Sequence, residues 1–274
     1  MDDFKILLTG DYWHADFQDL IRDNQNATTL LPIENLLESA NRDSDYSLIV
    51  IAQSRRNQFP NRLIEDLYLT RPQVPVVALS GSWCEGESRS GTPIPGLIRV
   101  YWHQWQGRLD SFCRQLASHQ TATWQLPRTY SIADQILYDR RLSGAQFEGE
   151  LVIGISALTP NSHEMLKDVC DSARLESVWV DALADDEELE VEPAVILADG
   201  NSMTNHLVER IRRIRTRFPA AATIVTLNFP RRYDFDVAQR EGILRVVSKP
   251  FILSDLHSQI FEIATQGSEA GSAA

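Results

Sequence analysis

Short apolar runs alternate with amphipathic segments along this chain, and polar or glycine residues separate them. The apolar runs occupy residues 4–9, 28–31, 46–52, 75–79 and 98–101, and then 151–155, 178–180, 193–198, 223–227 and 244–247. Several segments between the runs, such as 163–173 and 207–218, carry apolar residues at helical spacing. Runs that stay apolar on both faces are typical of parallel strands covered by helices. The pattern therefore predicts alternating strands and helices, which form βαβ units.

Right-handed βαβ units in series favour a doubly wound sheet. Five strands and five helices in each half of the chain fit the flavodoxin-like order of strands. We therefore expect an α/β protein with two doubly wound, five-stranded parallel sheets in tandem. In such sheets, functional side chains gather at the carboxyl ends of the strands.

The two halves of the chain match each other at a constant separation of 146 residues (199 − 53). This separation aligns four pairs of blocks, which are 5–11 with 151–157, 52–54 with 198–200, Ser80 with Thr226, and 96–105 with 242–251. Such internal repetition predicts one domain type present twice. The expected boundaries are domains at 1–117 and 149–266, a connector at 118–148 whose residues 131–142 have a helical pattern, and a disordered tail at 267–274.

Composition narrows the functional classes. The chain has 274 residues, 43% of them hydrophobic, and a formal net charge of −12. This charge argues against nonspecific binding of nucleic acid, which requires many phosphate contacts from Lys and Arg. No long apolar segment or signal peptide is present, so we expect a soluble, cytoplasmic protein without a membrane contact. The three cysteines, Cys84, Cys113 and Cys170, lack metal-binding spacing and are expected to be idle thiols.

Three reactive side chains follow strands three, four and five of the second half. They are Asp199, Thr226 and Lys249, and Pro250 follows the lysine, so that bond is a candidate cis bond. A carboxylate is a candidate nucleophile toward a phosphoryl group. A hydroxyl and a lysine are suited to bind the phosphoryl oxygens. The sequence therefore predicts a phosphate-handling crevice at this edge of the second sheet.

Asp199, Thr226 and the triplet Lys249-Pro250-Phe251 resemble the CheY-like receiver domains of two-component response regulators. The resemblance covers residues 148–265 well and residues 3–117 weakly. It implies that Asp199 accepts phosphate from a histidine kinase. It also implies that Thr226 and Lys249 couple phosphorylation to a shift of the face formed by helix four, strand five and helix five.

The second half departs from this family at the end of strand one. Receivers carry an acidic pair there, which holds Mg²⁺ together with the acceptor aspartate, but this chain has Ser156 and Ala157. Mg²⁺ prefers octahedral oxygen ligands that include carboxylates. Asp199 with the backbone carbonyl of Asn201 is a weak metal site, so we expect no cofactor and slow or absent autophosphorylation. Mg²⁺ belongs only to the alternative in which Asp199 is phosphorylated.

The first half departs in a different way. Asp11 matches one member of the acidic pair, and Ser80 matches Thr226. Gln53 replaces the acceptor aspartate, and His103 followed by Gln104 replaces Lys-Pro. A glutamine amide cannot form an acyl phosphate. The first half therefore resembles a degenerate receiver.

Each of these residues also has a purely structural interpretation. Asp199 is followed by Gly200, and an aspartate at this place can cap a turn after the strand. In its structural interpretation, Lys249 is retained only to pair with Asp199 and so stabilise the crevice, without a role in phosphorylation. Asp11 is expected as a turn residue, and His103 as a loop cap.

Charged and aromatic clusters remain. The acidic run 185–188, with Glu190 and Glu192, is expected to be solvated surface. The arginines at 210, 212, 213, 215 and 217 are expected to coat the exposed side of a helix, where they dock an acidic partner or pair with this run. Trp83, Trp102 and Trp105 are expected either as contact anchors or as residues packed against the connector.

These observations lead to three functional hypotheses. The first is a tandem pseudo-receiver in two-component signal transduction or a phosphorelay. It is not an enzyme and acts by protein–protein contact, with a histidine kinase, a downstream regulator or a second copy of itself as partner. The second is a slow phosphoacceptor response regulator that uses Asp199. The third is a small-molecule enzyme, for which the chain lacks a Gly-rich phosphate loop and a nucleophile elbow.

Overall fold

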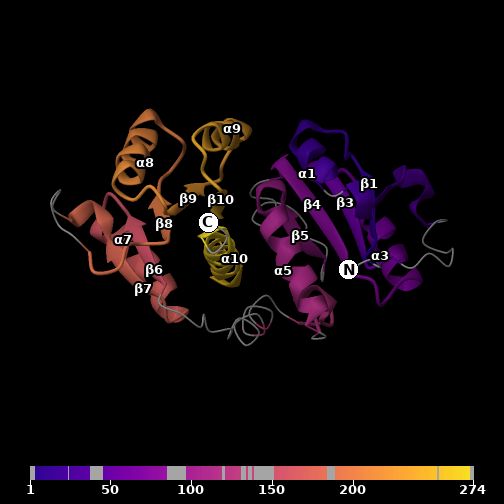
Figure 1. Ribbon diagram of the computed structural model, residues 1–274. Coiled ribbons are helices and arrows are strands. Elements are labelled where there is room, and N and C mark those ends of the chain that lie inside the picture. The colour runs from indigo at the N-terminus through magenta and orange to yellow at the C-terminus, as the bar shows by residue number, and fades with distance from the viewer. Residues whose placement is uncertain are drawn as a thin grey trace. The chain divides into compact units, whose positions relative to one another are not determined.

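The computed structural model describes residues 4–23, 25–37, 46–84, 97–118, 121–130, 134, 138, 151–183, 189–251 and 253–271. The chain divides into two units, Met1–Leu137 and Tyr138–Ala274. Each unit contains one five-stranded parallel sheet with helices packed against it (Figure 1). The predicted α/β fold class is therefore confirmed.

The first unit has strand order β2-β1-β3-β4-β5. Its strands are β1 (Ile6–Gly10), β2 (Thr28–Leu30), β3 (Leu48–Arg55), β4 (Val76–Trp83) and β5 (Ile98–Tyr101). Its helices are α1 (Gln18–Asp23), α3 (Asn61–Thr70) and α5 (Trp105–Ala117), with 3-10 turns η1 (Ala15–Phe17), η2 (Gln25–Ala27), η3 (Ile33–Asn35), η4 (Trp102–Gln104) and η5 (Thr123–Gln125).

The second unit has the same order, which is β7-β6-β8-β9-β10 when read from its β7 edge. Its strands are β6 (Val152–Ser156), β7 (Glu176–Trp179), β8 (Val195–Asp199), β9 (Ala222–Asn228) and β10 (Arg245–Lys249). Its helices are α7 (Pro160–Ser172), α8 (Asn205–Arg217), α9 (Arg232–Arg240) and α10 (Leu253–Gly271), with the 3-10 turn η6 (Val180–Ala182).

The strand pairings of the two sheets correspond at the separation seen in the sequence. Gln53 pairs with Ser80 between β3 and β4, and Asp199 pairs with Thr226 between β8 and β9. Both members of the second pair lie 146 residues beyond those of the first, as calculated from these registers (199 − 53 and 226 − 80). The side chains at the carboxyl edge of one sheet can therefore be compared position by position with those of the other.

Alternate strand residues of the second unit point to opposite faces, as the pleat of a strand requires. Leu197 packs with residues of α7 and α10, including Leu166 and Ile260. The next residue, Ala198, packs with α8 and α9, whose contributions include Leu207 and Val237. Helices therefore cover both faces of this sheet. Asp199, the next residue of β8, ends the buried part of the strand.

The hydroxyl caps explain where two of these helices begin. Thr159 precedes α7, and its side chain accepts a hydrogen bond from the Ser162 backbone N–H. Thr204 precedes α8 and accepts from the Leu207 backbone N–H in the same way. Such caps satisfy backbone donors that the first turn leaves unpaired. The Thr204 cap determines where α8 starts relative to Asp199, five residues earlier.

Part of the predicted connector belongs to the first unit. Trp124 is 5% exposed, and its ring stacks on Phe112 at 4.8 Å and on Trp105 at 6.2 Å between ring centroids. The Arg128 guanidinium lies 3.9 Å from the centre of the Tyr68 ring. The predicted boundary at residue 117 is therefore too early, because the segment after α5 folds back onto the core. The helix predicted at 131–142 lies, except for residues 134 and 138, outside the described residues.

The end of the chain also differs from the expectation. Helix α10 continues to Gly271, five residues into the segment 267–274 that composition predicts as a disordered tail. Its buried side chains include Leu256, Ile260 and Ile263. These side chains anchor the helix, whose last residues include two glycines, Gly267 and Gly271, that have low helix propensity. Among the described residues, none of the helices is long and apolar enough to cross a membrane.

Candidate functional site

The three reactive side chains of the second unit meet at the carboxyl edge of its sheet. The Lys249 ammonium donates a hydrogen bond to Asp199 Oδ1 at 2.7 Å between N and O. The Thr226 hydroxyl donates to the same oxygen at 3.0 Å. The side chains of Lys249 and Asp199 are only 16% and 14% exposed. The predicted convergence of these residues is thus present, and the Asp199 side chain bonds across the crevice instead of capping a turn.

Neighbouring backbone groups hold this arrangement in place. The Lys249 ammonium also donates to the Gly200 carbonyl at 2.9 Å, and the Lys249–Pro250 peptide bond is cis. A Cβ at position 200 would lie 2.5 Å from Leu207 Cδ2. Glycine therefore permits α8 to pack closely against the loop after Asp199. The Lys249 ammonium thus contacts both the Asp199 carboxylate and the backbone of the loop that follows it.

Arg210 is a site residue that the sequence pattern misses. Its guanidinium donates a hydrogen bond to the Asp199 backbone carbonyl, and the residue is 5% exposed. Burial lowers the pKa of Arg210, and the charges of Asp181 and Asp199 partly offset this effect. The prediction that all five arginines coat the exposed side of α8 is therefore wrong for Arg210. Its position three residues after the buried Leu207 was the available signal, because residues i and i+3 share a helix face.

Two of the other arginines form ion pairs at the surface. Arg212 donates two hydrogen bonds to the Glu241 carboxylate, at 2.6 and 2.7 Å. Arg213 lies 3.5 Å from Asp181. Residues 185–188 of the acidic run lie outside the described residues, while Glu190 and Glu192 are exposed.

At the end of β6, where receivers carry their acidic pair, this chain has Ser156 and Ala157. Ser156 is fully buried and Ala157 is 1% exposed. The Trp179 indole N–H donates to the Ala157 carbonyl at 3.1 Å, and the His163 ring stacks on Trp179 at 4.5 Å. The Ala157 carbonyl is therefore hydrogen-bonded to an indole that stacks on His163. Neither Ser156 nor Ala157 supplies a carboxylate for a metal.

The remaining weak candidate for a metal ligand is also engaged. The Asn201 backbone carbonyl accepts a hydrogen bond from the Asn228 N–H at 3.0 Å. The Asn201 side-chain oxygen accepts from Asn228 Nδ2 at 2.9 Å. Among the described residues there is no group of three or more His, Cys, Asp or Glu that could hold a metal ion. Both Asn201 oxygens thus have a hydrogen-bond partner in this arrangement.

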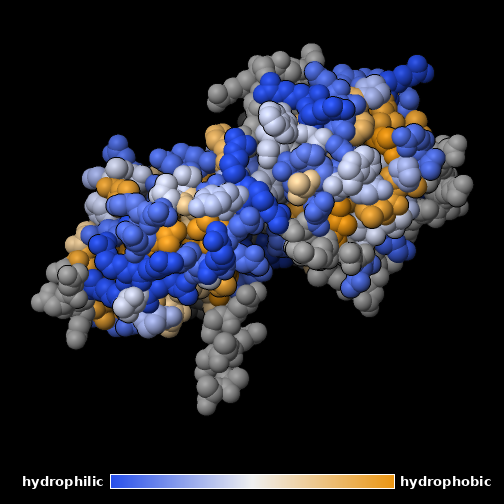
Figure 2. All heavy atoms as spheres, turned by 90° about the horizontal axis from the view of Figure 1, so that it is seen from above, coloured by the Kyte–Doolittle hydropathy of each residue, from blue (hydrophilic) through white to orange (hydrophobic). Residues whose placement is uncertain are grey.

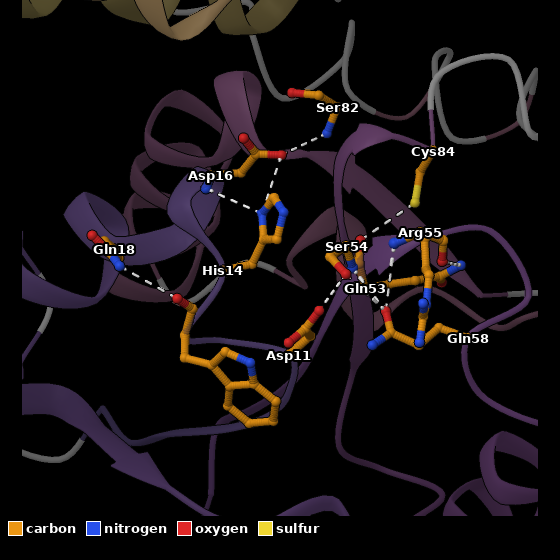
Figure 3. A network of polar contacts seen from close by, with 11 residues as sticks. Asp11, His14, Asp16, Gln18, Gln53, Ser54, Arg55, Gln58, Ser82 and Cys84 are labelled. Atoms are coloured by element: carbon orange, nitrogen blue, oxygen red, sulfur yellow. Dashed lines mark hydrogen bonds and ion pairs between the residues drawn. The ribbon is translucent and has the colours of Figure 1, made fainter.

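The first unit has a different polar network at the same edge (Figure 3). The Ser54 hydroxyl donates to Asp11 Oδ2, and the Ser54 backbone N–H donates to the Gln58 side chain at 2.9 Å. Gln53, at the position of Asp199, directs its amide nitrogen to the Arg55 carbonyl at 3.0 Å. Asp11 is thus hydrogen-bonded to Ser54, the residue after Gln53.

A second group adjoins this network. His14 Nδ1 lies 3.6 Å from Asp16 Oδ2, and the same carboxylate oxygen accepts from the Ser82 backbone N–H at 2.7 Å. Figure 3 shows His14 and Asp16 on the side of Asp11 away from Gln58. These bonds orient the imidazole at the end of β1. His14, Asp16, Arg55 and Arg56 were not predicted as site residues, and their signal in the sequence was a position at or just after the ends of strands one and three.

The last two candidates of the first unit are buried. Ser80 is 1% exposed on β4. His103 is 8% exposed in η4, and its ring stacks on Tyr101 at 5.6 Å between centroids. The prediction that His103 caps a loop is therefore wrong, because the aromatic ring packs instead beside Tyr101 and Trp102.

The three tryptophans selected from the sequence separate into two groups. Trp102 and Trp105 are 5% and 3% exposed, and Trp105 packs against Trp124 of the predicted connector. Trp83, at the end of β4, is 75% exposed. The packing interpretation therefore holds for Trp105, whereas Trp83 is available for contact.

Further apolar side chains are exposed around α9 and β10 of the second unit. Phe229, Tyr233 and Leu244 are 45%, 62% and 49% exposed. Phe229 also has a positive φ of 44°, which bulky L-residues rarely adopt. Apolar and hydrophilic patches lie beside each other on the face of each unit that Figure 2 shows.

The cysteines are free thiols. Burial raises the pKa of Cys170 to about 12 and that of Cys113 to about 11. The thiolate is the nucleophilic form of cysteine. These two thiols are therefore poor nucleophiles at neutral pH.

Comparison with known proteins finds similar solved structures, but no matching family model or curated protein. A CheY-like response regulator protein from Mesorhizobium loti is 12% identical, with 43% of this chain and 99% of that chain covered and a TM-score of 0.31. The Escherichia coli RcsC C-terminus, which contains a linker region and a phosphoreceiver domain, is 15% identical, with coverage of 99% and 96% and a TM-score of 0.35. A putative two-component system response regulator/GGDEF domain protein is 14% identical, with coverage of 96% and 99% and a TM-score of 0.39. Likeness at this level assigns neither a family nor an activity to the chain.

Proposed function

We propose that this chain is a signalling protein with two receiver-like units, which acts through protein–protein contact without Mg²⁺-dependent phosphorylation. One observation carries the proposal. Asp199 is paired with Lys249 at 2.7 Å and with Thr226 in a crevice where Ser156 and Ala157 stand in place of metal-binding carboxylates. The residues that would contact a phosphoryl group, Thr226 and Lys249, therefore lie against Asp199. The carboxylates that would bind the metal are replaced by Ser156 and Ala157.

The charges of the crevice support this interpretation. Transfer of a phosphoryl group to Asp199 brings a second anion to a carboxylate, and close like charges repel each other unless cations offset them. Lys249 supplies one positive charge, and it is shared between Asp199 and the Gly200 carbonyl. Mg²⁺ would supply two more charges, but Ser156 and Ala157 provide no carboxylate to hold it beside Asp199. The ion pair is thus the resting arrangement of this crevice.

The first unit supports the same conclusion independently. Gln53 stands where the acceptor is expected, and its amide nitrogen donates to the Arg55 carbonyl. An amide does not form an acyl phosphate. In our proposal this unit contributes a binding surface and no phosphoryl chemistry.

A path of hydrogen bonds connects the Asp199 loop with α9. Asp234, in the first turn of α9, is 4% exposed and accepts from the Met203 N–H at 2.7 Å and from the Arg231 N–H at 2.8 Å. Met203 lies in the loop between Asp199 and α8. We therefore propose that the apolar side chains near α9, Phe229 and Tyr233, form the contact face. The proposed partner that can be tested first is a second copy of this chain, which would pair symmetrically.

Intact mass after incubation with acetyl phosphate and Mg²⁺ tests the absence of phosphorylation. The expected result is an unchanged mass for the full chain, because the metal is not held and Asp199 is paired with Lys249. Asp199→Ala serves as the control. A gain of one phosphoryl group that disappears in this variant would overturn the proposal and establish the alternative, a slow phosphoacceptor at Asp199.

The contact face is tested by Tyr233→Ala. Tyr233 is 62% exposed, and an exposed substitution usually changes stability by no more than about 0.5 kcal/mol. Loss of an aromatic anchor weakens association by roughly tenfold or more. Sedimentation velocity over a concentration series should therefore show a dimer that dissociates more readily in the variant.

Leu69→Ala is the matched control, because Leu69 is 82% exposed on α3 of the first unit. It should leave the dimer unchanged. A wild-type chain that stays monomeric at all concentrations, or equal effects of the two substitutions, would contradict self-association through α9.

A further inference from the structure

The first unit contains an open cleft of about 630 Å³ at the carboxyl edge of its sheet. The cleft is lined by residues at or beyond the carboxyl ends of β1, β3 and β4, which are Asp11, His14, Ser54, Arg55, Arg56 and Trp83. In the order β2-β1-β3-β4-β5, the strand order reverses between β1 and β3. Loops diverge at such a switch point and leave a crevice where ligands bind in open α/β sheets. The volume is also within the range of small-molecule sites.

One wall of the cleft is an exposed indole. Trp83 is 75% exposed at the end of β4, whereas Trp102 and Trp105 of the same unit are buried. A solvated indole offers a large flat apolar surface, on which planar rings stack favourably. The ligand that this wall fits therefore contains an aromatic or heteroaromatic ring.

A second wall carries positive charge. Arg55 ends β3, and Arg56 follows it directly. The planar guanidinium group binds phosphate and carboxylate through paired N–H donors. Two adjacent arginines in a cleft contrast with the formal net charge of −12 of the whole chain. This wall fits the anionic group of a ligand.

The floor of the cleft is polar and held in position. Ser54 donates to Asp11 Oδ2, and the Ser54 backbone N–H is itself bonded to Gln58 at 2.9 Å. The oriented Asp11 carboxylate can accept further hydrogen bonds, because each carboxylate oxygen has more than one lone pair. Donors of the hydroxyl type, such as those of a sugar, fit this position.

We propose that this cleft binds a mononucleotide. The base stacks on Trp83, the phosphates bind Arg55 and Arg56, and the sugar hydroxyls donate to Asp11. The three walls carry three different chemistries, and a nucleotide combines a planar ring, hydroxyls and an anion in one small molecule. The inference concerns the first unit and does not depend on the behaviour of Asp199.

Calorimetric titration of the full chain with ADP and with GDP, without metal ions, tests the proposal. We expect one site per chain for at least one of the two nucleotides. Trp83→Ala should weaken this binding by roughly tenfold, the usual effect of losing a base-stacking partner. Arg55→Ala should weaken it by roughly tenfold as well, because a charge-assisted hydrogen bond to phosphate is lost.

Two matched controls separate the cleft from the rest of the surface. Trp13→Ala removes another exposed indole, 64% exposed, that does not line the cleft. Arg62→Ala removes a guanidinium side chain that is 88% exposed on α3. Both variants should bind as the wild-type chain does. Circular dichroism would verify that all four variants keep the fold.

Two further probes divide the contributions of the ligand. Adenosine should bind more weakly than ADP, because it lacks the phosphates that face Arg55. Inorganic phosphate should also bind more weakly, because it lacks the ring that stacks on Trp83. Absence of binding for both ADP and GDP at millimolar concentration overturns the proposal. Binding that neither Trp83→Ala nor Arg55→Ala weakens, or equal affinity for phosphate and ADP, overturns it too.

Discussion

Replacement of Trp124 by alanine is expected to destabilise the first unit by about 3–5 kcal/mol, the usual cost of removing a large buried aromatic side chain. Trp124 is 5% exposed and stacks on both Phe112 and Trp105. The substitution would remove these ring contacts and leave a cavity beside α5. The neighbouring residue Ala122 is fully buried, so the segment has little freedom to collapse into the space.

Urea unfolding of the full chain, followed by circular dichroism, measures this effect. The chain has two units, so the curve must be analysed for two transitions, and one of them should move to lower urea. Trp83→Ala is the matched control, because its indole is 75% exposed and its loss should change stability by about 0.5 kcal/mol or less. A similar small effect of both substitutions would show that residues 121–128 are a linker and not part of the first unit.

Replacement of Arg210 by methionine is expected to destabilise the second unit by about 1–3 kcal/mol, because the Asp199 carbonyl loses its charged hydrogen-bond donor and the nearby Asp181 carboxylate loses a positive charge. Arg210 is 5% exposed and donates to the Asp199 carbonyl. The Asp181 carboxylate acts on its pKa from nearby, and the Asp181 side chain is 13% exposed. Methionine preserves the apolar stem but removes the positive charge near Asp181, whose ion pair among the described residues is with Arg213, 72% exposed.

A double-mutant cycle with Asp181→Asn tests this cause. The double variant Asp181→Asn, Arg210→Met should be more stable than the sum of the two single effects predicts, by at least about 1 kcal/mol. Arg212→Met is the control, because Arg212 pairs with Glu241 at the surface, and exposed pairs contribute about 1 kcal/mol or less. Strictly additive effects would show that Arg210 and Asp181 do not stabilise each other.

The convergence of Asp199, Thr226 and Lys249 could be predicted from the sequence. Each residue follows or ends an apolar run, and the carboxyl ends of parallel strands meet at one edge of the sheet. The separation of 146 residues likewise appears in the registers Gln53↔Ser80 and Asp199↔Thr226. These features depend on the strand pattern, which is local.

The role of Arg210 could not be read from the same pattern. Its spacing from Leu207 places Arg210 on the buried face of α8, but the charge of an arginine favours an exposed position. In the fold, close packing of α8 at Gly200 brings the Arg210 guanidinium to the Asp199 carbonyl. Trp124 was missed for a similar reason, because no periodic apolar pattern surrounds it and its partners lie in α5.

By itself, the sequence determined the α/β class, the two sheets, the order of their strands and the edge at which the polar residues gather. These follow from periodicity and chain direction, which the backbone geometry of strands and helices imposes on any such pattern. Only the tertiary structure decided which arginine is buried, where the first unit ends, and that Asp11, Arg55 and Trp83 line one cleft. Those outcomes depend on how loops and side chains from distant segments pack together, and a local pattern carries no information about that packing.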